Sequence, residues 1–190
     1  MVDGVNVKDY SLEYLHNKLG YVPQKAVMFN GTVTSNIEYG DNGKQKPTME
    51  QVKKAIEVAQ GTEFVEKMDN SYNAHIAQGG TNISGGQKQR LAIARAVARD
   101  PEIYIFDDSF SALDYKTDAK LRHDLRAYAK DATMLIVAQR IGTILNADKI
   151  IVLESGKCVG MGTHKELLEN CDVYKQIALS QISEEELKNA

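Results

Sequence analysis

The chain has 190 residues, of which 43% are hydrophobic and 26% charged, and its formal net charge is −3. These values predict one globular domain with a substantial core, and they give no electrostatic case for nucleic acid as a partner. Because apolar runs such as residues 134–138 are strand-sized and the two cysteines are too few for a disulfide scaffold, we expect a soluble cytosolic domain, alone or cut from something larger.

The first clear element is a helix over residues 48–60, with one apolar face made by Met49, Val52, Ile56 and Ala59. Thr48 and Gln51 have the spacing of a capping box, and Gly61 is predicted to end the helix. A second helix is expected over residues 87–99, with Leu91, Ala94 and Ala98 inward and Arg90, Arg95 and Arg99 available for polar contacts.

A continuous apolar run then ends on a carboxylate, at Ile103–Asp107. Further elements are expected as helices over 117–129, 164–169 and 172–182, strands over 133–138 and 149–154, and a last short strand after the turn at Ser155-Gly156. Apolar strands separated by helices predict an α/β fold with a mostly parallel sheet covered on both faces. Ligands of such sheets bind beyond the carboxyl ends of the strands, where Asp107 and Gln139 are expected.

The strongest local motif is Ser84-Gly85-Gly86-Gln87 at the start of a helix. Two glycines allow a ligand to approach the backbone closely, and the N–H groups of a first helical turn favour an anion. A structural alternative is a capping box between Ser84 and Gln87, with the glycines only making the turn. The two interpretations are compatible.

A second motif is the pair Asp107-Asp108 after the apolar strand. A carboxylate there can hold Mg²⁺, directly or through water, and the next one can orient an attacking water. The alternative is a solvated strand end. Asp114, in the turn that follows, could simply cap the next helix.

Together these segments resemble the ATP-binding cassette (ABC) of transporters. Ile83–Gln87 resembles the family's signature, the strand ending in Asp107-Asp108 its Walker B motif, and Ser111–Asp114 its D-loop. Tyr21–Gln24 resembles the Q-loop. Phe29–Ile37 resembles the segment that follows the Q-loop in exporter-type cassettes, and Gly162–Tyr174 resembles their C-terminal end. The resemblance covers about residues 1–180, in the family's order and spacing.

The resemblance implies a role for each matching residue. Gln24 would sense Mg²⁺ and the attacking water and couple to the transmembrane domain, while Asp107 would bind Mg²⁺ through water. Asp108 would be a weak base and Gln139 a weak phosphate contact. The residues implied to bind ATP or to link the two sites are Ser84, Gly85, Gly86, Gln87 and Asp114.

Four departures from the family pattern stand out. No Gly-x-x-x-x-Gly-Lys-Ser/Thr phosphate loop (Walker A) occurs in the chain, so the strand and helix that bear it are expected to be absent. The family's catalytic glutamate is Asp108 here, and its switch histidine is Gln139. The glutamate often found before the signature is Gln78. By resemblance, the absent strand would lie beside residues 103–107.

These departures resemble the degenerate subunit of heterodimeric exporters. The implied partners are a second cassette and a transmembrane domain, the implied ligands ATP and Mg²⁺, and the implied location the cytoplasmic face of the cell membrane. Residues 1–182 would form a partial nucleotide-binding domain with a helical signature subdomain at about 30–100, the remainder a RecA-like core, and residues 183–190 a polar tail. Two rivals are a non-catalytic regulatory cassette and, less favoured by the exporter-type segments, a soluble ABC ATPase.

Overall fold

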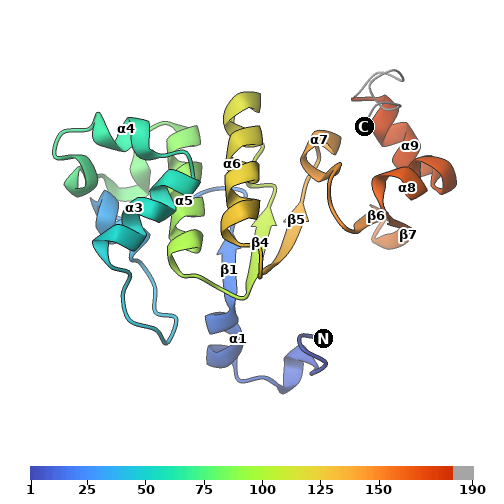
Figure 1. Cartoon of the computed structure of the whole chain (residues 1–190), viewed down its shortest axis with the longest axis horizontal. Coiled ribbons are helices and arrows are strands. Elements are labelled where there is room, and N and C mark those ends of the chain that lie inside the picture. The colour runs from blue at the N-terminus through green and yellow to red at the C-terminus, as the bar shows by residue number, and fades with distance from the viewer. Residues whose placement is uncertain (182–190) are drawn as a thin grey trace. The chain divides into compact units, whose positions relative to one another are not determined.

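The computed structural model describes residues 1–181, and the chain divides into two compact units, Met1–Val137 and a second that begins at Ala138. The first unit contains the following helices and strands (Figure 1): η1 Val7–Asp9, α1 Leu12–Lys18, β1 Leu19–Val22, β2 Gly31–Thr32, α2 Val33–Ile37, α3 Met49–Val58, α4 Thr62–Glu66, η2 Ser71–Asn73, β3 His75–Ile76, η3 Gln78–Gly80, α5 Gly85–Ala98, β4 Ile103–Asp107, α6 Tyr115–Tyr128 and β5 Thr133–Val137. The second contains α7 Ile141–Ile144, β6 Ile150–Glu154, β7 Lys157–Gly162, α8 His164–Asn170 and α9 Asp172–Leu179.

A parallel three-stranded sheet with the order β1-β4-β5 organises the first unit. Tyr21 lies opposite Ile105 and Asp107 opposite Val137, so the carboxyl ends of all three strands lie at one edge of the sheet. This confirms the predicted α/β class and the position of Asp107 at a strand end.

The two faces of this sheet differ in how they are covered. The face with Val22, Tyr104 and Phe106 is buried in a core that includes Leu91 of α5 and Leu121 of α6. On the opposite face Tyr21, Leu135 and Val137 are 56%, 52% and 51% exposed. The expectation of a sheet covered on both faces is therefore wrong for the described chain, although the apolar side chains that suit a second cover are in place.

The central strand β4 is paired on both edges, with β1 on one side and β5 on the other. A further strand could not lie beside residues 103–107 without displacing one of these, so that expectation is wrong. Unpaired backbone groups remain at the outer edges of β1 and β5, where another parallel strand could add.

The two long predicted helices form as expected, with boundaries set by their caps. Thr48 and Gln51 form the predicted capping box of α3, although Met49 is exposed rather than buried. The helix ends through Gln60, which takes a left-handed φ of 58°, rather than through Gly61. Gly61 is needed for close approach, because a Cβ there would lie 2.9 Å from Cγ2 of Ile56.

Helix α5 begins two residues earlier than predicted, at Gly85. Arg90, Arg95 and the C-cap residue Arg99 make the expected polar contacts. Arg95 donates to the backbone carbonyls of Asn36 and Val27, at 2.7 and 3.0 Å. Arg90 donates to the carbonyl of Gln60 at 2.7 Å. These contacts attach α5 to the segments around it.

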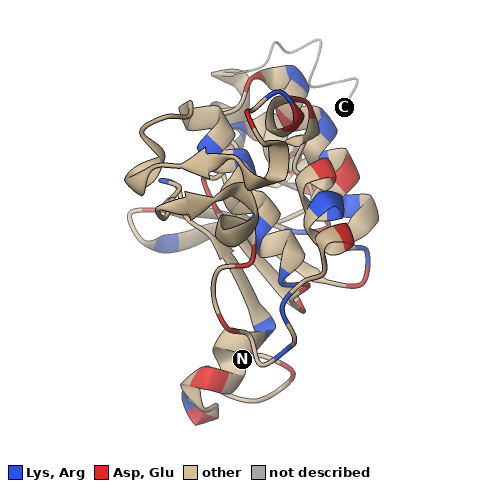
Figure 2. Cartoon of the chain, turned by 90° about the vertical axis from the view of Figure 1, so that its left-hand side faces the viewer, with Lys and Arg blue, Asp and Glu red and all other residues tan. Residues whose placement is uncertain are grey.

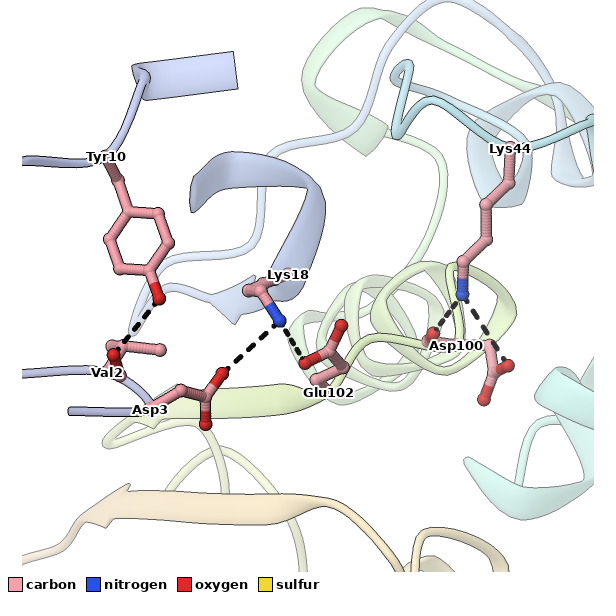
Figure 3. Close-up of polar contacts among 7 residues, drawn as sticks. All are labelled: Val2, Asp3, Tyr10, Lys18, Lys44, Asp100 and Glu102. Atoms are coloured by element: carbon pink, nitrogen blue, oxygen red, sulfur yellow. Dashed lines mark hydrogen bonds and ion pairs between the residues drawn. The ribbon is translucent and has the colours of Figure 1, made fainter. Parts of the chain in front are cut away.

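Ion pairs fasten the N-terminal segment to the start of β4 (Figure 3). Lys18, at the end of α1, contacts both Asp3 and Glu102, and these hydrogen bonds raise the pKa of the lysine. Lys44 donates to the backbone carbonyl of Asp100 at 2.7 Å. Because Glu102 immediately precedes β4, the Lys18 contact helps to fix the register of β1 and β4.

The second unit contains an antiparallel hairpin of β6 and β7, turned through Ser155 and Gly156 as predicted. Helix α9 ends at Leu179, within its predicted range, but Ile182 and the tail 183–190 lie outside the described residues. Ile150 and Val152 of the hairpin share a small core with Leu167 of α8.

No helix within residues 1–181 combines the length and the hydropathy needed to cross a bilayer. Acidic and basic positions are interspersed along the helices in the charge-coloured view (Figure 2).

Candidate functional site

The first cluster lies where β4 ends. Asp107 is the last residue of the strand, and its Oδ2 accepts a hydrogen bond from the phenol of Tyr21 on β1, at 3.1 Å. This bond is the main cause of a raised pKa of Tyr21, because it holds the phenolic proton.

Asp108 is bound to the glutamine predicted from the Q-loop resemblance. Nε2 of Gln24 donates to Oδ2 of Asp108 at 2.8 Å, and the backbone N–H of Asp108 donates to the carbonyl of Val137. Its φ of 46° lies in the left-handed region, which aspartate tolerates better than most residues do. The structure thus brings together Gln24 and Asp108, which are 84 positions apart in the chain.

Two buried side chains, Ser109 and Gln89, hold the Gln24 segment in place. The Ser109 hydroxyl donates to the carbonyl of Val22 at 2.7 Å, and the amide of Gln89 donates to the carbonyl of Pro23 at 3.1 Å. Gln89 is 2% exposed and lies on α5, so it links the signature helix to the Q-loop. Sequence reasoning missed both residues; the only available signal was their position beside the motifs.

The Ser84-Gly85-Gly86-Gln87 segment forms the first turn of α5. The Ser84 hydroxyl accepts from the N–H of Gln87 at 3.2 Å, and the Gln87 side chain accepts from the N–H of Ser84 at 2.9 Å. This confirms the capping box. The N–H groups of Gly85 and Gly86 have no intrahelical carbonyl to bind and therefore stay available to a ligand.

Internal packing does not require the two glycines of this turn. A Cβ on Gly85 would meet no heavy atom of the described chain within 4 Å, and one on Gly86 would make an ordinary contact at 3.5 Å with the carbonyl of Ala112. Glycine in a helix costs about 0.5–1 kcal/mol relative to alanine. Their open surface is what a closely approaching ligand requires.

Asp114 caps α6, as the structural alternative predicted. Its Oδ1 accepts from the N–H of Thr117 at 3.0 Å, and hydrogen bonds from Thr117 lower the pKa of Asp114. The positive charge of Arg90 lowers the same pKa further. The charge of Arg90 on α5 therefore acts on the turn that precedes α6, and its guanidinium lies 4.6 Å from the centre of the Phe64 ring.

Gln139 belongs to the second unit, shortly after β5 ends and before α7 begins. Its backbone carbonyl accepts from the side chain of Gln181 at 2.8 Å. Gln78 lies in η3, where its side chain accepts from the N–H of Asn30 at 3.1 Å. The contact of Gln139 with phosphate stays a prediction.

The donor groups present fit Mg²⁺ and an anionic ligand in part. No group of three or more His, Cys, Asp or Glu side chains among residues 1–181 is arranged to hold a metal ion. Mg²⁺ usually binds one or two carboxylates and completes its shell with waters and substrate phosphates, and Asp107 suits that use. The first turn of α5 suits a phosphate oxygen.

Comparisons with known proteins agree with these motifs. A family model described as "ABC transporter" matches residues 1–111. An uncharacterised ABC transporter ATP-binding protein of Mycobacterium tuberculosis is 48% identical over 95% of this chain and 31% of its own length. The ATP-dependent lipid A-core flippase of Haemophilus ducreyi is 39% identical over 97% of the chain and 31% of its own length.

A solved structure of a bacterial Atm1-family ABC exporter with ATP bound superposes with a TM-score of 0.89 and 33% sequence identity. The alignment covers 95% of this chain and 31% of that one, so the chain spans about a third of these relatives. The chain belongs to the ABC transporter family, as an exporter-type nucleotide-binding domain.

Proposed function

We propose that this chain works within an ABC exporter, in which ATP binding and hydrolysis drive transport across a membrane. In this proposal it pairs with a second cassette and with a transmembrane domain. The support comes from the family match, from relatives that include an ATP-dependent flippase, and from similarity to an exporter with ATP bound.

We further propose that the chain serves two ATP sites unequally. Ser84, Gly85 and Gly86, with Gln87 completing the cap, would bind the γ-phosphate of ATP held by the partner cassette. The observation that supports this most directly is the open surface over Gly85, since the chain's own packing gives no reason for a glycine there. A phosphate oxygen at the first turn would accept the unused N–H groups.

The chain's own site would be degenerate. Asp107 would hold Mg²⁺, which when bound neutralises phosphate charge, and Asp108 would stand in for a longer catalytic carboxylate. One methylene fewer withdraws that carboxylate by about an ångström, a displacement that can cost about 10²-fold in rate. Gln24 already occupies one Asp108 oxygen, so Gln24 and Asp108 would respond to nucleotide together. Gln139 would supply a neutral phosphate contact in place of a titratable one.

Asp114 would connect the two sites. It caps α6, while the Ala112 carbonyl of the same turn lies beside Gly86 of the signature. A shift of α5 on binding the partner's ATP would therefore displace the turn between Asp108 and Asp114. In the same proposal, residues of about 30–100 form the helical subdomain that carries the signature.

The test is steady-state ATP hydrolysis by the assembled exporter with Asp108→Glu against the parent. Restoring the longer carboxylate should raise turnover severalfold if this site is an impaired catalytic site. No increase in turnover would favour the regulatory-cassette alternative.

A pulldown tests the exporter assignment separately. Recovery of the chain with a membrane-bound partner would support that assignment, and recovery only with soluble partners would contradict it.

A further inference from the structure

The phenol of Tyr21 makes a contact that none of the motifs explains. Tyr21 lies on β1 opposite Ile105, two residues before Asp107 on the neighbouring strand. Two residues of a strand span about 6.6 Å, which is close to the length of a tyrosine side chain. The ring therefore lies along the uncovered sheet face and brings its hydroxyl to the carboxyl end, 3.1 Å from Oδ2 of Asp107.

The ring itself contributes little to the core. Tyr21 is 56% exposed, and the adjacent positions on β1, Gly20 and Val22, provide the buried face of the strand. The group with a specific partner is the hydroxyl, which donates to a carboxylate. Such charge-assisted bonds are about twice as strong as bonds between neutral groups.

We infer that Tyr21 is a positioning residue for Asp107, which holds the carboxylate so that one oxygen is taken by the phenol and the other is presented to Mg²⁺ or its water. The inference rests on the metal role proposed above for Asp107. Groups that hydrogen-bond a ligating carboxylate fix its orientation, and their loss usually costs about 10–100-fold in metal affinity. Because Tyr21 is half exposed, we expect the lower end of that range, about tenfold.

The experiment measures Mn²⁺ affinity by electron paramagnetic resonance in the assembled exporter, with a non-hydrolysable ATP analogue. Asp107→Asn identifies the fraction of metal that depends on this chain's site. Tyr21→Phe keeps the ring and should weaken that fraction about tenfold. Tyr14→Phe, which removes the hydroxyl of another half-exposed tyrosine on α1, is the matched control and should leave Mn²⁺ affinity unchanged.

The double variant Tyr21→Phe with Asp107→Asn should bind Mn²⁺ no more weakly than Asp107→Asn alone, because the phenol acts through that carboxylate. A further loss in the double variant would overturn the inference. If Asp107→Asn weakens the metal and Tyr21→Phe does not, the Tyr21 role is wrong and the proposed function stands. If Asp107→Asn has no effect, the metal role of Asp107 in the proposed function falls, and the Tyr21 inference falls with it.

Discussion

The first turn of α5 and the carboxyl end of β4 differ in what occupies their functional groups. In the α5 turn the cap is complete within Ser84 and Gln87, and the surface over Gly85 is open. At the end of β4, Tyr21 binds Asp107 and Gln24 binds Asp108, so the carboxylates are already engaged within the chain.

This difference separates a surface left open to an outside ligand from a cluster in which one oxygen of each carboxylate already accepts a hydrogen bond from within the chain. The α5 turn retains two glycines at a cost in helix propensity, which a closely approaching phosphate would explain. The β4 cluster has the shorter carboxylate and is stabilised by its own hydrogen bonds. Under the proposed function, the first region serves the partner's ATP and the second is an impaired site of this chain.

The largest expected effect comes from Gly85→Asp. A Cβ at this position would meet no heavy atom of the described chain within 4 Å, and the carboxylate beyond it would place a negative charge where a γ-phosphate is proposed to sit. We expect ATP hydrolysis by the assembled exporter to fall about 10²-fold or more, as for loss of a transition-state donor.

Gly85→Ala separates the charge from the backbone change. Because the site is open, alanine should not lower the melting temperature of the chain, yet it should reduce hydrolysis if phosphate approaches the α-carbon closely. If the Gly85→Ala variant and the Gly85→Asp variant each hydrolysed ATP at the parent's rate, the glycine would have no role in ATP binding.

A second prediction compares two capping boxes. Ser84→Ala and Thr48→Ala each remove one N-cap hydroxyl, so each should cost about 1 kcal/mol of unfolding free energy, measured by denaturant titration. Only Ser84→Ala should also lower ATP hydrolysis, because only its hydroxyl is proposed to face phosphate. Equal losses of activity in both variants would make the Ser84 effect one of stability alone.

A third prediction concerns the uncovered face beside the β4 cluster. The 190-residue polypeptide expressed by itself should self-associate through this face, detectably by sedimentation velocity. Leu135→Lys should weaken that association about tenfold, equivalent to about 1.4 kcal/mol, whereas Thr133→Lys on the same face removes less apolar area and should weaken it less. A monodisperse monomer of the parent chain would contradict the prediction.

The elements with local signals could be predicted from the sequence. The capping box at Thr48, the amphipathic spacing of α3 and α5, and the apolar run ending in Asp107 all depend on residues a few positions apart. The cap alternatives for Ser84 and Asp114 were also local and are confirmed.

The contacts that build the β4 cluster could not be predicted in this way. Tyr21 meets Asp107 only because β1 pairs with β4, and the sequence does not state which strands pair. The expectation of a strand beside residues 103–107 came from the family resemblance, and it is wrong because β1 and β5 already pair with the two edges of β4. Burial of Gln89 against Pro23 likewise depends on how α5 packs, which helix periodicity does not determine.

Under the proposed function, the chain contributes more to the partner's ATP site than to its own. The most direct measurement is the steady-state ATPase rate of the assembled exporter with Gly85→Asp and with Asp108→Ala, each against the parent. We expect Gly85→Asp to nearly abolish hydrolysis and Asp108→Ala to lower it by no more than a few-fold. If Asp108→Ala proved as damaging as Gly85→Asp, this chain would perform catalysis itself, and the degenerate-site proposal would be wrong.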